Sequence, residues 1–144
     1  VRAGASPAAM YRELYEQDTW GRVRLRGLIL TRVMVEADGR LAHTFVLRDD
    51  FTQTQSLPSD TEDVINLTLA IAGVQFAVIF VEQKQGGFKI SFRSRCAIDC
   101  SRLAERFGGG GHKAAAGAYI AGSLEEAQQV VLGAVRAAFD SFRS

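Results

Sequence analysis

This 144-residue sequence has no long apolar run, few cysteines and few histidines. These absences argue against a membrane-spanning protein, a disulfide-rich protein and a histidine-based metal site. Without an apolar run of ~18 residues, the sequence predicts no membrane-spanning helix, and its first residues hold no apolar block of signal-peptide type. The only cysteines, Cys96 and Cys100, lack the CxxC redox spacing and are too few to bind zinc, so we expect two reduced thiols. These features favour a cytoplasmic protein that makes no use of a membrane.

Charge is nearly balanced over the whole chain, with a formal net charge of +1. The balance hides a basic segment, residues 84–113, where seven lysines and arginines against two acidic residues give +5. The rest of the chain therefore carries −4. This distribution favours an anionic partner for one surface, although a solvated charged face would look the same in the sequence.

Apolar residues make up 47% of the chain, enough for one globular core. Residues 74–81 are almost wholly apolar and predict a central strand buried on both faces. Gly86-Gly87 predicts a hairpin turn, Asp99 a helix start, and Ser123 a capping box with Glu126. The expected helices cover residues 8–18, 20–33, 49–55, 61–72, 99–106 and 123 onward, and the expected strands 41–47, 74–81, 88–95 and 118–121. We predict an α/β (α+β) domain, in which helices flank a mixed sheet of four to five strands.

The most informative segment is residues 108–117, with four consecutive glycines, then His112 and Lys113, then four small residues. Ordering glycines costs conformational entropy, but their bare N–H groups can form a concave site for an anion. The interpretations that stay open are a glycine-rich phosphate-binding loop, a flexible linker and an extended helix C-cap. The residues of the phosphate-binding interpretation are Gly109, Gly110, Gly111 and His112.

A second basic feature lies on the strand predicted for residues 88–95. Alternation places Ser91, Arg93 and Arg95 on one face, and Phe92 and Ser94 on the other. The planar guanidinium of arginine suits phosphate oxygens. An exposed sheet edge would show the same pattern, so this strand gains weight only if it lies beside the glycine segment.

Together these two motifs resemble a known family. The glycine segment ending at His112 and followed by Ala115-Ala116-Gly117, with the stretch Ser91 to Ser94, is similar to the C-terminal, DHH-associated domain of the Asp-His-His (DHH) phosphoesterases. The bacterial oligoribonuclease and 3′-phosphoadenosine 5′-phosphate phosphatase (nano-RNase) type is the most similar, over residues 20–132. The resemblance implies that residues 109–112 contact a substrate phosphate, and that Ser91, Arg93 and Ser94 bind phosphate or the nucleotide.

The catalytic domain of that family binds two manganese ions through clusters of Asp and His, and nothing in this sequence corresponds to it. The histidines are His43 and His112, and no Asp-His-His triplet occurs. A two-metal centre needs several carboxylate and imidazole ligands, so we expect Mn²⁺ only in the parent enzyme and no metal ion or hydrolysis in this chain alone. By resemblance, residues 1–36 form a helical connection to an N-terminal DHH domain, and residues 37–144 form the substrate-binding domain.

The implied partners are short RNA or nucleotide phosphates and the DHH domain of the same parent protein. Whether the chain forms a homodimer stays open, as does the choice among the possible phosphorylated substrates. Two alternative functions also stay open. One is a stand-alone module that binds RNA or a nucleotide, and the other is a relative of the tRNA-contacting C-terminal domain of alanyl-tRNA synthetase.

Overall fold

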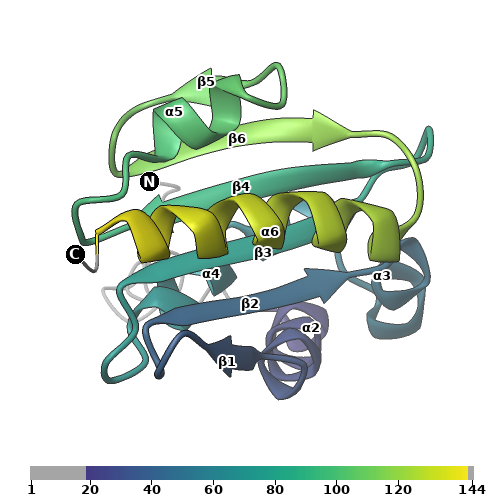
Figure 1. Ribbon diagram of the computed structural model, residues 1–144. Helices are drawn as coiled ribbons and strands as arrows, with labels where there is room; N and C mark the ends of the chain where they lie inside the picture. Colours follow the sequence, from purple (N-terminus) through teal and green to yellow (C-terminus); the bar gives the residue numbers. More distant parts are fainter. Residues whose placement is uncertain (1–18, 143–144) are drawn as a thin grey trace, which may run out of the picture.

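A mixed sheet forms the centre of the computed structural model, which describes residues 19–142 (Figure 1). Its six strands lie in the order β1-β2-β3-β4-β6-β5. Their bounds are β1 (Met34–Glu36), β2 (Leu41–Val46), β3 (Phe76–Glu82), β4 (Phe88–Ser94), β5 (Gly110–Gly111) and β6 (Ala115–Ile120). Strands β2 and β3 are parallel, and all other neighbouring pairs in the described sheet are antiparallel.

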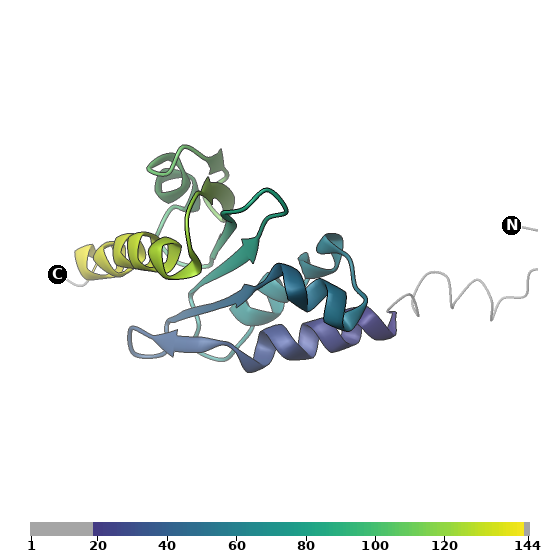
Figure 2. The same cartoon turned by 90° about the vertical axis from the view of Figure 1, so that its right-hand side faces the viewer.

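Helices cover the two faces of this sheet (Figures 1 and 2). They are α2 (Trp20–Thr31), α3 (Arg48–Thr54), the 3₁₀ helix η1 (Pro58–Thr61), α4 (Val64–Leu69), α5 (Cys100–Glu105) and α6 (Leu124–Ser141). Figure 1 shows α6 running across the front of the strands, with α2 and α4 behind them. Within residues 19–142, no helix combines the length and the apolar character needed to cross a membrane.

The central strand β3 contributes to a core on each side of the sheet, as its apolar sequence predicts. Phe76, Val78 and Phe80 pack in the cluster that includes α5 and α6. Ala77 and Ile79 point the other way, into the cluster formed with α2 and α4. Because every residue from Phe76 to Val81 is buried, polar side chains are excluded here, and any polar site must lie on a neighbouring strand.

Local capping signals fix where two helices begin. The Asp99 side chain accepts hydrogen bonds from the backbone of Ser101 and Arg102 at the start of α5. Ser123 and Glu126 form a reciprocal capping box at the start of α6. Both starts confirm the sequence prediction and the physical argument behind it, which is that a side-chain oxygen satisfies free N–H groups of the first turn.

Only half of the second sheet face is covered. The buried cluster beneath α2 and α4 draws its strand residues from β2 and β3 alone. None of its buried members comes from β4, β5 or β6. Helix α4 still contacts β4, so among the described residues this face lacks a packed helical layer only beyond β4, over β6 and β5.

The α/β prediction is confirmed, but the sheet has six strands where four to five were expected. The added strands β1 and β5 are only three and two residues long, too short to give an alternation pattern. The helix expected over residues 61–72 forms as α4 but is shorter at both ends, Val64–Leu69, and the separate turn η1 precedes it. The buried Asp60 accepts a hydrogen bond from Leu57 N at 2.8 Å and pairs with Arg22, which holds η1 in place as a separate turn.

The N-terminal part of the chain bears on the expected domain boundary at residue 36. The helix expected over residues 8–18 lies outside the described residues. Helix α2 buries Leu25 and Ile29 completely against the sheet, so it shares a core with the residues that follow. The division at residues 36 and 37 stays a prediction.

Candidate phosphate-binding site

The glycine segment forms most of an edge hairpin instead of a free loop. Gly108, with φ of +80°, turns the chain after α5, and Gly109 N donates to Ala104 O at 2.8 Å. Residues 110 and 111 then pair with β6 as strand β5. His112 and Ala115 close the hairpin through backbone hydrogen bonds of 2.8 and 3.2 Å. The linker interpretation is therefore wrong, because these backbone groups are held in a ladder. The C-cap interpretation is confirmed for Gly108, whose positive φ ends α5.

Close packing explains two of these glycines but not a third. A Cβ on Gly109 would lie 2.8 Å from the Ala118 Cβ, and one on Gly111 would lie 2.7 Å from the Ala116 Cβ. Gly110 differs, because a Cβ there would meet nothing within 4 Å and its φ is not positive. Glycine inside a strand often marks the close approach of another group, and at Gly110 no group of the described protein makes that approach.

Strand pairing brings the glycine segment and the basic strand together on one face. Gly110 pairs with Gly117 of β6, and Gly117 pairs with Ser91 of β4. In the next row, His112 pairs with Ala115, which pairs with Arg93. Directly paired residues project to the same side of a sheet, and neighbouring strands are ~4.8 Å apart.

Ser91 and Arg93 therefore lie about two strand spacings, ~10 Å, from Gly110 and His112. All four residues share the face on which the helical cover ends at β4. The sequence argument required the basic strand to lie beside the glycine segment. Strand β6 lies between them and pairs with both.

Two other residues of the basic strand lie elsewhere. Ser94 is only 8% exposed and lies on the core side, where its hydroxyl is 3.3 Å from Cys96 N. Arg95 follows the end of β4, and its Nη1 donates to Leu69 O at the end of α4. The structure therefore does not bring Ser94 to the open face, and it engages the Arg95 guanidinium in a structural contact.

A hollow of about 520 Å³ adjoins this face, between β4 and the η1 region. Lys89, Ser91 and Arg93 line one side of it, and Glu62 belongs to the opposite side. Its floor is apolar, and includes Ile79. Lys89 was not among the residues selected from the sequence, although its alternation with Ser91 and Arg93 was the signal that could have found it.

The charges at the hollow leave room for an anion. Among the described residues, neither Lys89 nor Arg93 has a carboxylate partner. The only side-chain hydrogen bond of Arg93 within that part of the chain is from Nη1 to the Phe92 carbonyl, at 2.9 Å. An arginine so placed keeps most of its five donors for a ligand. Oxygen atoms of phosphate fit this arrangement.

The other histidine, His43, has a structural role. It is 7% exposed, and its Nε2 lies 2.9 Å from Glu36 Oε2. Glu36 also pairs with Arg136 of α6, so the three side chains join the edge strand β1 to β2 and α6. No group of three or more His, Cys, Asp or Glu that could hold a metal ion is found between residues 19 and 142.

Fold and site together define a small α/β domain with a half-covered sheet, a glycine-rich edge hairpin and a cationic strand facing the uncovered side. The DHHA1 domain family matches residues 42–139, which run from β2 into α6 and include the cationic strand and the glycine-rich hairpin. The chain belongs to the DHHA1 domain family, and the resemblance to the DHH-associated domain is confirmed.

Two curated relatives carry the same description, bifunctional oligoribonuclease and PAP phosphatase NrnA. The protein of Thermus thermophilus is 33% identical over 114 residues, which are 78% of this chain and 33% of that protein. The protein of Bacillus subtilis is 29% identical over 126 residues, 88% of this chain and 39% of that protein. The chain thus spans between a third and two fifths of the length of these relatives.

Two solved structures have a similar fold. An exopolyphosphatase-related protein from Bacteroides fragilis matches with a TM-score of 0.80 at 31% identity, over 92% of this chain and 39% of that chain. The pGpG-specific phosphodiesterase PggH from Vibrio cholerae matches with a TM-score of 0.57 at 17% identity, over 91% and 42%. The second similarity shows that the fold is shared.

Proposed function

We propose that this domain binds short oligoribonucleotides or nucleotide phosphates for a manganese-dependent phosphoesterase, whose metal site lies on a separate DHH domain of the parent protein. The observation that carries the proposal is the shared open face, where Ser91 and Arg93 of β4 lie in the same rows as Gly110 and His112. The relatives described as oligoribonuclease and PAP phosphatase support the substrate class.

Each part of this face has a task in the proposal. Arg93 supplies a guanidinium to phosphate oxygens, and Lys89 adds a second cation on the same side of β4. Gly110 lets the ligand approach the backbone closely. His112 offers an imidazole at the hairpin end, where it is exposed to solvent.

The chemistry of bond cleavage is assigned to the other domain. Manganese would activate the attacking water there. The described residues of this chain do not fit such a centre, because they contain no suitable ligand cluster and the candidate site is cationic. The task of this domain is to hold the phosphate and the nucleotide in place, which lowers the barrier by orienting the reacting groups.

Titration of the 144-residue chain with 3′-phosphoadenosine 5′-phosphate and a 5′-phosphorylated RNA dinucleotide tests this proposal. We expect binding without turnover, and a loss of affinity of about tenfold or more for Arg93→Ala, since hydrogen bonds to charged groups contribute ~1.5–3 kcal/mol. Arg48→Ala is the matched control, because Arg48 is an exposed arginine at the start of α3 that does not line the hollow.

Equal affinities of the two variants would refute the role of Arg93. In the parent two-domain enzyme, Arg93→Ala should raise KM, and the control should leave it unchanged. Hydrolysis by the isolated chain would refute the division of labour between the domains.

A further inference from the structure

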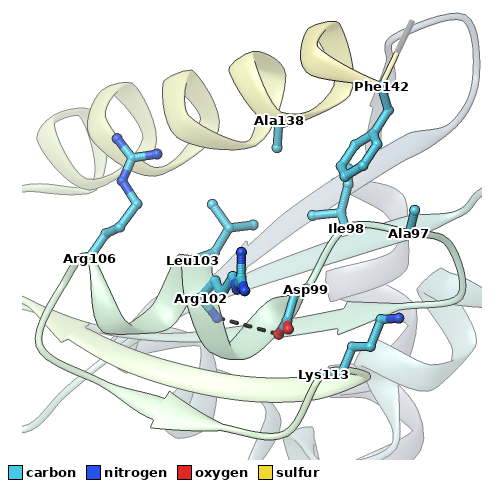
Figure 3. Close-up of a pocket in the computed structure, with 9 residues that line it drawn as sticks. All are labelled: Ala97, Ile98, Asp99, Arg102, Leu103, Arg106, Lys113, Ala138 and Phe142. Atoms are coloured by element: carbon cyan, nitrogen blue, oxygen red, sulfur yellow. Dashed lines mark hydrogen bonds between the residues drawn. The ribbon is translucent and has the colours of Figure 1, made fainter.

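A second pocket lies on the opposite side of the sheet, between α5 and the last turn of α6 (Figure 3). Its volume is about 360 Å³, within the range of small-molecule sites, ~300–1,000 Å³. It shares no lining residue with the hollow beside β4. Lys113 of the β5–β6 hairpin turn lines it, whereas no residue of that hairpin lines the hollow beside β4.

Positive charge is in excess around this pocket. Arg102, Arg106 and Lys113 line it, and none of them forms an ion pair within residues 19–142. The one carboxylate of the lining is Asp99. With three cations and one carboxylate, the lining carries a net charge of +2.

Asp99 offsets part of that positive charge, since it attracts Arg102, but its carboxylate is engaged at the start of α5. Its Oδ1 accepts hydrogen bonds from Ser101 N at 2.9 Å and Ser101 Oγ at 2.6 Å, where it caps α5. The hydrogen bond from the Ser101 hydroxyl is the main reason why the pKa of Asp99 lies below its ordinary value. The carboxylate therefore stays ionised and committed to the helix start, and the guanidinium and ammonium groups face solvent.

The other half of the pocket is apolar. Ile98 and Leu103 are buried at its base, with Ala138 of α6 beside them. Phe142 is 59% exposed, and Figure 3 shows its ring beside Ile98 at the pocket rim. A large exposed aromatic ring next to an apolar floor is a surface on which a planar ring can stack.

We infer that this pocket binds a nucleoside monophosphate, with the phosphate held by Arg102 at the centre of the pocket and the base against Phe142, while Arg106 and Lys113 contribute positive charge from its two ends. An inorganic phosphate would use the cations and leave the apolar half exposed, whereas an uncharged planar ligand would leave the cations unbalanced. A nucleotide fits both halves, because its phosphate can carry two negative charges opposite a net charge of +2. The inference is independent of the function proposed for the β4 face.

Amide-resolved NMR titration of the 144-residue chain tests the inference, with adenosine 5′-monophosphate, adenosine and orthophosphate as separate probes. We expect the monophosphate to shift amides of residues 97–106 and 138–142, and to bind more tightly than either other probe. Phe142→Ala should weaken binding of the monophosphate about tenfold, as expected for one base–aromatic stack, and leave orthophosphate binding unchanged. Arg102→Ala should weaken both.

Arg93→Ala is the control for the other site, and should leave the shifts at residues 97–106 unchanged. Shifts confined to residues 89–93 and 110–112 would overturn the inference and assign the nucleotide to the β4 face alone. Equal affinity for orthophosphate and the monophosphate would overturn the base contact. Absence of shifts at residues 97–106 at millimolar monophosphate would overturn the site as a whole.

Discussion

Gly109, just before β5, and Gly110, the first residue of β5, are adjacent. Replacing each by alanine should change the stability of the fold in opposite directions. In Gly109→Ala the new methyl group meets Ala118 at 2.7–2.8 Å, and one of the atoms it meets is a backbone Cα that cannot rotate away. Overpacking of this kind costs ~1–3 kcal/mol, and the rigid partner places Gly109→Ala at the upper end. In Gly110→Ala the methyl group meets no atom, so replacing glycine should stabilise the fold by ~0.4–1 kcal/mol.

Thermal unfolding followed by circular dichroism separates these two outcomes. A change of 1 kcal/mol shifts Tm by ~2–4 °C for a domain near this size. Gly109→Ala should therefore lower Tm by ~6–12 °C, and Gly110→Ala should leave Tm unchanged or raise it by up to ~4 °C.

Ligand binding gives the second half of this prediction. The methyl group of Gly110→Ala projects from the open face in the row of Ser91, so affinity for 3′-phosphoadenosine 5′-phosphate should fall although the domain is fully folded. A loss of about tenfold corresponds to ~1.4 kcal/mol, roughly one charge-assisted hydrogen bond. If Gly110→Ala unfolds as early as Gly109→Ala, or binds as tightly as the unmodified chain, the assignment of Gly110 to a ligand contact is refuted.

Two further predictions concern the core. Asp50 is buried and accepts hydrogen bonds from Arg32 at 2.6 and 2.9 Å, so Asp50→Asn should lower the free energy of unfolding in urea at neutral pH by ~3 kcal/mol. Burial alone would raise the pKa of Asp50, but the hydrogen bonds from Arg32 and Leu47 lower it overall. This contribution should thus be complete above ~pH 4 and disappear as the pH falls through the folded-state pKa, and a pH-independent effect would contradict it. Burial raises the pKa of the Cys100 thiol to about 12, so alkylation of the native protein at pH 8 should label Cys96 and spare Cys100 in peptide mass spectra. Comparable labelling of the two thiols would show that α5 opens readily.

Features that depend on a few neighbouring residues could be predicted from the sequence. The capping oxygens of Asp99 and Ser123 determine two helix starts, because the N–H groups they satisfy lie two or three residues away. The apolar run of β3 and the alternation of β4 predicted both strands within one or two residues. The alternation also separated the Arg93 side of β4 from the Phe92 side, because successive residues of a strand project to opposite faces.

Features that depend on pairing between distant segments required the tertiary structure. Strands β1 and β5 exist because β2 and β6 supply their hydrogen-bond partners, and two or three residues hold too little pattern to predict a strand. The position of Lys89 in the hollow depends on η1, which lies about 30 residues earlier in the chain.

The sequence by itself determined the family, the α/β class and the two motifs that carry positive charge and bare backbone. Only the tertiary structure decided that these motifs share a face. Residues of β6 pair with Arg93 and Ser91 on one side and with His112 and Gly110 on the other. It also decided that this face is open beyond β4, because the buried cluster beneath α2 and α4 takes its strand residues from β2 and β3, and α4 reaches no farther than β4. The physical reason is that strand register and helix coverage are set by the core as a whole, whereas caps and alternation are set locally.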